Sequence, residues 1–489
     1  MLMIDKQEFF VRNTVMKISN NKNVCSKMWP YIQQFCNETT IHGLNIVGLP
    51  NLHILERLLW TLVILIAAIG AVAVSISNLS RFLANPTVVS IQKDYRNWNN
   101  HFPTATGCFI NKVDLNKAES FIYRRWRLTP EDERYPYYLE FVKLVTNSTF
   151  YNFDLLTPFQ KDPTLRDVDM GQLAVEVHPN LSGTLVTIER NYQSNWQLIM
   201  TEVGICFTFN SKFVQLLSPN ASNPKTSNEL KCHFLNGVCY ARYDSDPTLP
   251  LKYYIHSYIE FPHTTSKVSH EVEKGDEIEI NYRMIEADSS PDIKYLSPSQ
   301  RMCRFDDEPI TNDVTGYSLS ICYTVCRYKL ALKLCGCKPF FYHFLAKGKV
   351  CDISGLICLS KYATQLTREP SQLGCTCPQP CHLISYLPLN PKYTKWNEGG
   401  YFDERIAFRW GLLHPTTKYR RDILFGFGDL IVSLGGTFNL FLGISFISII
   451  EAIYLIFKIV IRSIQDHIMT KNRNKICVQR KLPLSSVVQ

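Results

Sequence analysis

The fold of this chain is decided by residues 430–457, LIVSLGGTFNLFLGISFISIIEAIYLIF. As one straight helix this apolar run would extend about 42 Å, well beyond the ~30 Å hydrocarbon core of a bilayer. At about 100° per residue, its polar face changes sides near Gly443-Ile444-Ser445, which predicts a break in the helix there. Ser448 and Glu451 point away from the face used before the break. That first face holds Val432, Gly435, Gly436, Asn439 and Gly443.

The predicted break has two interpretations. Irregular backbone at membrane depth is tolerated where protein or a water-filled path satisfies its carbonyls, and a carboxylate such as Glu451 is costly there unless it serves an ion path or a partner. A tightly packed anchor with a glycine and serine interface would explain the same residues. The segment alone does not decide between a pore and an anchor.

A second apolar segment, residues 58–77, reads LLWTLVILIAAIGAVAVSIS and contains no charge. It predicts a membrane-spanning helix, and it is too long and too far from the N-terminus for a cleaved signal peptide. We therefore expect a membrane protein in which two transmembrane helices flank a large extracellular domain. The expected divisions are a tail at 1–57, a first helix at 58–78, an ectodomain at 79–428, a second helix at 429–457 and a tail at 458–489.

The charge distribution predicts the orientation in the membrane. The tails at 1–57 and 458–489 carry net charges of +2 and +6, out of +9 for the whole chain. This basic excess is typical of cytosolic segments, so we expect both termini in the cytosol and a plasma-membrane location for the chain. The same excess makes nucleic-acid binding unnecessary as an explanation of the charge.

The cysteine pattern indicates an oxidising compartment. Fourteen of the 17 cysteines lie from Cys108 to Cys381, with CxxxC and CxC spacings, so disulfides are favoured over a zinc site and no metal is expected. Cys232 and Cys239 are close enough in sequence to close a small loop. The densest part, which we call the cysteine ladder, holds Cys303, Cys322, Cys326, Cys335, Cys337, Cys351, Cys358, Cys375, Cys377 and Cys381.

The rest of the external part predicts a disulfide-rich α+β domain. Strand-like runs begin at Leu185 and Gly204 and alternate with loops rich in Asn, Pro and Ser. Three sequons for N-glycosylation fall in this part, at Asn147, Asn180 and Asn220.

Several of these features, taken in order along the chain, resemble the degenerin and epithelial sodium channel superfamily. They are His42-Gly43 before the first helix, Phe102-Pro103 leading to Cys108, the cysteine ladder, and Gly435-Gly436 followed by Gly443-Ile444-Ser445 and Glu451. The segment LSPSQRMCRF at residues 296–305 is similar to the insect pickpocket branch.

The resemblance implies a trimeric, voltage-independent, sodium-selective channel whose subunits are shaped as a hand holding a ball. Gly443, Ile444 and Ser445 would form the selectivity filter, and His42 with Gly43 would lie in a cytosolic re-entrant loop that supports gating. The implied disulfides are Cys303–Cys381, Cys322–Cys377, Cys326–Cys375, Cys335–Cys358, Cys337–Cys351 and Cys108–Cys206, which leaves Cys232 with Cys239.

Three residues depart from the family pattern. Val432 stands where small side chains favour closure, Ser433 where acid-sensing members carry an acidic residue, and Asn439 where a smaller residue accompanies amiloride block. Resting closure, the outer cation site and drug sensitivity are therefore not predicted by the resemblance.

Other classes of protein fit the sequence less well. A double-pass class B scavenger or lipid receptor needs neither a glycine-broken filter nor a cysteine ladder, and the basic ATP-site motif of purinergic channels is not found. No nucleophile, metal or phosphate motif indicates an enzyme or a cofactor. A non-conducting accessory subunit, a homomeric or heteromeric trimer, and the nature of the stimulus stay open.

Overall fold

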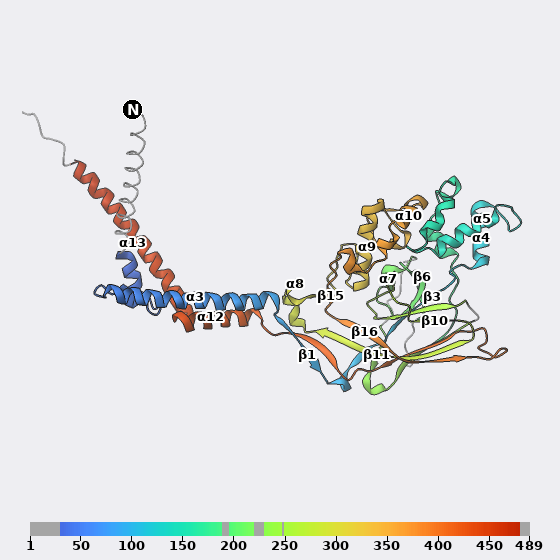
Figure 1. Cartoon of the computed structure of the whole chain (residues 1–489), viewed down its shortest axis with the longest axis horizontal. Coiled ribbons are helices and arrows are strands. Elements are labelled where there is room, and N and C mark those ends of the chain that lie inside the picture. Colours follow the sequence, from blue (N-terminus) through green and yellow to red (C-terminus); the bar gives the residue numbers. More distant parts are fainter. Residues whose placement is uncertain (1–29, 188–194, 220–228, 247–248, 480–489) are drawn as a thin grey trace, which may run out of the picture. The chain divides into compact units, whose positions relative to one another are not determined.

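The computed structural model describes residues 30–187, 195–219, 229–246 and 249–479 (Figure 1). The chain divides into two compact units, one from residues 1–86 and 424–489 and the other from residues 87–423. The division falls inside the expected boundaries 79 and 428, because the first helix continues to Ala84 and the second begins at Phe427.

The first unit contains the helices predicted to cross the membrane. Within the described residues, one helix is long and apolar enough to do so alone, and a second span is possible only if two helices that meet at a 69° bend are counted together. Residues 30–38 are also helical. The remaining helices of this unit are α2 (Leu44–Gly48), α3 (Ile54–Ala84), α12 (Phe427–Leu442) and α13 (Phe446–Gln479).

Helix α12 ends at the predicted break because of Gly443. This residue has φ +61° and ψ 24°, the left-handed conformation in which glycine is favoured at helix ends, and its N–H donates to the carbonyl of Asn439. Helix α12 lies beside α3 (Figure 1). They meet closely where Gly70 faces Phe441, since a Cβ atom at position 70 would lie 2.8 Å from that ring.

The second unit is built on two sheets, a larger mixed one and a smaller antiparallel one. The larger runs in the order β1-β18-β11-β17-β8-β4 with β16 paired to β11, and the smaller in the order β10-β9-β3-β6-β5. The larger sheet comprises β1 (Thr87–Gln92), β4 (Gly183–Thr187), β8 (Cys239–Ser245), β11 (Asp276–Ser289), β16 (Leu383–Lys395), β17 (Ala407–Leu413) and β18 (Lys418–Ile423). The smaller comprises β3 (Thr104–Phe109), β5 (Gln197–Thr201), β6 (Gly204–Phe209), β9 (Leu251–His256) and β10 (His270–Val272).

Aromatic side chains fill the space between the two sheets. Phe408 and Trp410 of β17 stack on each other, and Tyr253 of β9 stacks on Phe408 with ring centroids 4.1 Å apart. Phe209 of β6 meets Trp410 edge to face. All four rings are buried, so this contact joins strands that are far apart in the sequence into one core.

Helices and short strand pairs complete the second unit. The main helices are α4 (Leu115–Trp126), α5 (Tyr135–Thr146), α6 (Met170–Glu176), α9 (Leu319–Cys335) and α10 (Ile353–Ser360). The short pairs are β2 (Asn99–His101) with β7 (Lys231–His233), β12 (Cys303–Arg304) with β15 (Gln379–Pro380), and β13 (Cys337–Lys338) with β14 (Lys349–Val350).

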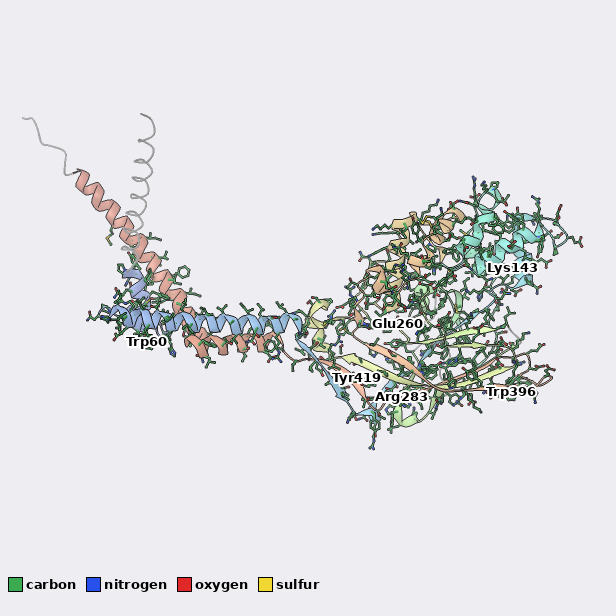
Figure 2. All side chains as sticks on the ribbon, in the orientation of Figure 1. Trp60, Lys143, Glu260, Arg283, Trp396 and Tyr419 are labelled. Carbon is green, nitrogen blue, oxygen red and sulfur yellow. A yellow bond between two sulfur atoms is a disulfide. The ribbon has the colours of Figure 1, made fainter. Side chains whose placement is uncertain are left out.

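Helix α9 is held at its N-terminus and along its side by two carboxylates. Glu260 (Figure 2) accepts the backbone N–H groups of Leu319 and Ser320, which the first turn of a helix leaves without partners. Farther along, Arg327 and Glu202 form an ion pair of 3.0 Å in which both side chains are almost completely buried. Breaking such a pair leaves a buried charge, so it fixes the position of α9.

Every cysteine from Cys108 to Cys381 is in a disulfide, so none of these thiols is available to a metal. The seven bonds join the same pairs that the resemblance and the leftover loop implied. They are Cys108–Cys206, Cys232–Cys239, Cys303–Cys381, Cys322–Cys377, Cys326–Cys375, Cys335–Cys358 and Cys337–Cys351.

Each disulfide of the cysteine ladder lies inside the sequence loop that the previous one closes. This nested order predicts how much the free energy of unfolding falls when one disulfide is removed. Cys303 and Cys381 are 78 residues apart, but Cys322–Cys377 already closes most of that loop. We expect serine at both Cys303 and Cys381 to lower the unfolding free energy by about 3 kcal/mol, as for a short loop, rather than by about 4.5 kcal/mol. Denaturant unfolding of the full chain in detergent measures the difference.

The innermost pair is the matched control. Replacing Cys337 and Cys351 by serine should cost a similar amount, because this pair also closes only a short stretch inside another disulfide. An outer pair that costs about 1.5 kcal/mol more than the inner pair, the difference expected if its whole loop were open, would contradict the nested account.

Candidate functional site

The break between α12 and α13 is stabilised by two serines. The side-chain oxygens of Ser445 and Ser448 lie 3.0 Å apart. Ser445 Oγ accepts the N–H of Ser448 at 3.1 Å, and Ser448 Oγ lies 3.3 Å from the N–H of Ser445. These contacts satisfy N–H groups that the start of α13 would leave without partners, so one helix can end and the next begin at this point.

The His42-Gly43 pair lies against this break. The N–H of His42 donates to the carbonyl of Leu442 at 3.1 Å. A Cβ atom at Gly443 would lie 2.4 Å from His42 Nδ1, closer than any real contact, so the imidazole occupies the space that the glycine leaves. The structure thus brings together two predicted motifs that are about 400 residues apart in the chain.

Gly43 packs on the other side of the same segment. Its φ of +83° is favoured by glycine, and a Cβ atom there would lie 3.1 Å from Ile64 of α3. The ring of Trp60 (Figure 2), one turn earlier on α3, lies 3.7 Å from the same point. His42 therefore faces the break while Gly43 allows the segment to approach α3.

Thr40, which the sequence did not single out, provides a second contact to α13. Its hydroxyl lies 2.6 Å from Glu451 Oε2 and 3.0 Å from Ser448 Oγ. Glu451, expected near an ion path or a partner, thus has a partner in its own N-terminal segment. A threonine two residues before a His-Gly pair is too common a pattern to have predicted this contact.

An ion pair extends the contact along α13. Glu38 and Lys458 are 2.8 Å apart, and each side chain is about one-third exposed. Hydrogen bonds from Lys458 and Gln34 lower the pKa of Glu38. At this exposure the pair contributes little stability by itself. Its effect is to fix which residues of the N-terminal segment lie against which residues of α13.

The remaining predicted pore residues form a face that the described part of the chain does not cover. Val432 is 75% exposed and Asn439 is exposed. A Cβ atom at Gly435 or Gly436 would meet nothing within 4 Å. Ser433 is half-buried at the edge of this face. Gly443, at the end of this face, is the part that His42 covers.

A titratable cluster lies in the second unit, where β2, β11, β16 and β18 meet. Glu286 lies 2.5 Å from Lys418 and 2.9 Å from His382. Burial raises the pKa of this carboxyl, but the hydrogen bonds from His382 and Lys418 outweigh burial, so the pKa lies below its ordinary value. Burial, with Lys231 nearby, lowers the pKa of His101 to about 3. His101 is therefore neutral at neutral pH, and its ring stacks on Tyr258 at 4.2 Å.

Comparison with known proteins identifies the class of protein to which this chain belongs. The profile of the amiloride-sensitive sodium channel family matches residues 35–455, from the helix before His42 into the first third of α13. The chain belongs to this family. It is a sodium channel subunit, and the receptor alternative is not favoured.

Individual relatives place the chain in the insect branch of the degenerin and epithelial sodium channel superfamily. Sodium channel protein Nach of Drosophila ananassae is 25% identical, with 94% of this chain and 91% of the relative covered. Pickpocket protein 28 of Drosophila melanogaster is 21% identical, with 86% and 77% covered. Acid-sensing ion channel 4 of Mus musculus is 22% identical, with 87% and 79% covered.

The two described sequons differ in accessibility, which predicts their use. Asn180 is exposed, and Lys117 contacts only its oxygen, whereas the amide of half-buried Asn147 bonds the backbone of Lys143 and of Lys112. We expect Asn180→Gln to remove a glycan, seen as a mobility shift that glycosidase abolishes. Asn220 lies outside the described residues.

The control is Ser182→Ala, which keeps Asn180 and removes the acceptor sequence, so it should give the same shift. Loss of the glycan with Asn147→Gln but not with Asn180→Gln would reverse this assignment.

The contact of Gly443 with His42 gives a second prediction. We expect Gly443→Ala to abolish most sodium current, because its Cβ atom would displace the imidazole and its left-handed backbone is strained for alanine by about 1 kcal/mol or more. Current is measured together with surface labelling, which should be unchanged. Gly428→Ala is the matched control, since a Cβ atom there meets nothing within 4 Å.

Proposed function

We propose that this chain is one subunit of a trimeric, voltage-independent, sodium-selective channel of the plasma membrane that is opened through its ectodomain. In this proposal α3 and the broken pair of α12 and α13 cross the bilayer, with both termini in the cytosol. The observation that carries the proposal is the break at residues 443–445 with His42 packed on it.

Assembly follows from the number of spans. Two membrane segments per chain cannot enclose a pore, so neighbouring subunits must supply the rest of its wall. Glycines at positions 435 and 436 have open space at their Cα atoms, and small residues let helices of different chains approach closely. The uncovered face of α12 is therefore proposed to line the pore and to meet the other two subunits.

Selection of sodium is assigned to the break. Three copies of Gly443, Ile444 and Ser445 would form a ring of carbonyls and hydroxyls narrow enough to replace part of the hydration shell of a cation. Because Gly443 has no side chain, its carbonyl can approach the axis closely. The wider positions near Val432 would then control closure rather than selection.

Gating is assigned to the N-terminal segment, residues 38–43. His42 contacts the break directly, and Thr40 and Glu38 contact α13 below it. A shift of this segment would therefore move the start of α13 relative to α12. Val432, Ser433 and Asn439 are proposed as the positions at which closure, the outer cation site and drug binding differ from those of relatives.

The test is current in cells that express the chain, alone and with sister subunits. We expect a sodium current with little dependence on voltage, and we expect replacement of Ser445 by a bulky residue to alter the sodium-over-potassium permeability ratio at unchanged surface amount. Gly428→Ala should alter neither. The ratio is measured from reversal potentials in mixed solutions.

Other outcomes separate the alternatives. Current that requires a sister subunit and is insensitive to replacement of Ser445 would indicate an accessory, non-conducting subunit. Absence of current in every combination, with increased lipid uptake, would contradict the channel proposal.

A further inference from the structure

The segment LSPSQRMCRF, residues 296–305, has no part in the pore, yet it is densely bonded. It comprises Leu296, which caps the short helix η5 (Pro291–Tyr295), the short helix α8 (Pro298–Arg301) and β12 in the second unit. Ser297 and Gln300 form a capping box, and Pro298 occupies the first helical position. These features start a helix at a defined residue, so the segment fixes where the side chain of Arg301 begins.

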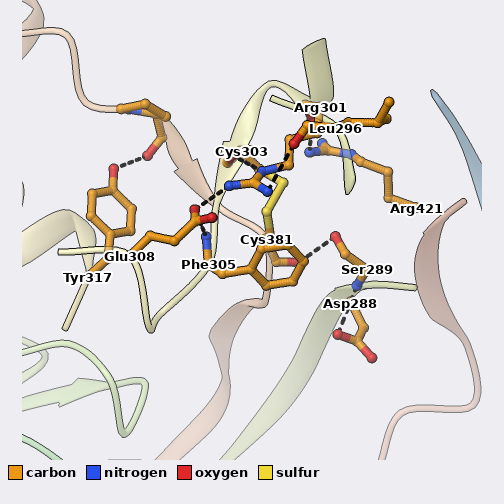
Figure 3. Close-up of a disulfide and its surroundings, with 11 residues drawn as sticks. Asp288, Ser289, Leu296, Arg301, Cys303, Phe305, Glu308, Tyr317, Cys381 and Arg421 are labelled. Carbon is orange, nitrogen blue, oxygen red and sulfur yellow. Dashed lines mark hydrogen bonds and ion pairs between the residues drawn. A yellow bond between two sulfur atoms is a disulfide. The ribbon is translucent and has the colours of Figure 1, made fainter. Parts of the chain in front are cut away.

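Arg301 is the centre of this segment (Figure 3). Its side chain is 1% exposed. Its Nε donates to the carbonyl of Cys303 at 2.9 Å, one terminal nitrogen donates to the carbonyl of Leu296 at 3.2 Å, and the other pairs with Glu308. The guanidinium also lies 4.8 Å from the centre of the Phe305 ring. A buried charge with fewer partners would be costly, so these contacts hold the segment in one geometry.

The backbone of Arg301 is used by a second arginine. Arg421 of β18 donates from Nη1 to the carbonyl of Arg301 at 3.0 Å (Figure 3). The carbonyl of Arg421 accepts the N–H of Ser290, and Ser289 donates its hydroxyl to the carbonyl of Cys381. The base of the cysteine ladder, at Cys303–Cys381, is thus bonded to the ends of both β18 and β11.

Strand β18 is the part of the second unit that leads into α12. It ends at Ile423, and α12 begins at Phe427. Its antiparallel partner β1 follows α3 in the chain, with Thr87 opposite Ile423. Whatever holds β18 therefore holds the ectodomain end of both proposed membrane segments.

We propose that Arg301 is a positioning residue that holds β18 to the base of the cysteine ladder through Arg421. A displacement of the ladder then reaches the strand that leads to α12, instead of being absorbed in the loop before Cys303. The contact stands on the structure of the second unit alone; its consequence for channel opening rests on the proposed function.

Hydrogen–deuterium exchange of the purified full chain in lipid nanodiscs tests the contact without requiring current. Arg301→Lys keeps a charge opposite Glu308 but cannot donate to both carbonyls. The segment that presents the carbonyl of residue 301 to Arg421 is then loosened, so we expect exchange of peptides that cover residues 418–425 to speed up by about tenfold, the effect of losing the charge-assisted hydrogen bond from Arg421. Arg421→Gln, which leaves the buried contacts of Arg301 intact, should give the same effect.

Arg420→Gln is the matched control on the same strand. Arg420 pairs with Asp422 at 3.0 Å and is 38% exposed, so its loss should leave exchange of residues 418–425 within about twofold. The double variant Arg301→Lys with Arg421→Gln should exchange no faster than the faster single variant. Arg301→Lys loosens the segment that presents the carbonyl and Arg421→Gln removes its donor, so both act on the same contact. Additive effects, or an unchanged rate in Arg421→Gln, would overturn the proposal.

Current then tests the consequence separately. With any stimulus that opens the channel, Arg301→Lys and Arg421→Gln should change opening and closing rates at an unchanged sodium-over-potassium ratio, and Arg420→Gln should change neither. Altered exchange with unaltered gating rates would overturn the role in coupling. Absence of all current in the unmodified chain would instead count against the proposed function.

Discussion

The proposed pore depends on one left-handed turn that carries no side chain. At Gly443 the helix ends, the backbone reverses its twist, and the imidazole of His42 fills the space where a Cβ atom would be. A straight helix through this point would keep its carbonyls hydrogen-bonded within the helix and would leave no space for the imidazole of His42. The polar contacts of Ser448 and Glu451 then follow, because α13 restarts in a direction that turns them toward Thr40.

The ectodomain is held by a different kind of constraint. The seven disulfides restrict the unfolded chain, whereas buried ion pairs such as Arg327 with Glu202 and Arg301 with Glu308 select one packed arrangement. Both pairs lie where the ladder meets other elements of the unit. The disulfides hold the ladder together covalently, and the ion pairs define how the ladder packs on the rest of the unit.

Much of this arrangement could be predicted from the sequence, since its signals are periodic or covalent. The change of polar face located the break at Gly443, and the order of the cysteines agreed with the bonds in the structure. Contacts between distant loops left no such signal. Thr40 and the pair Arg301 and Arg421 acquire their roles only from tertiary packing, because a single threonine or arginine is compatible with any solvated surface. Helix α3 also continues to Ala84 and α12 begins at Phe427, because polar residues extend both helices beyond the apolar runs.

The nested arrangement of the ladder determines how mechanical load travels through the chain. The outermost bond connects Cys303, shortly after β11, to Cys381, just before β16. Tension entering along β11 can leave along β16 through two sulfur atoms, so the intervening residues bear none of it along their backbone. Helices α9 and α10 therefore lie outside the covalent path from β11 to β16. Stretching these two strands need not stretch the helices.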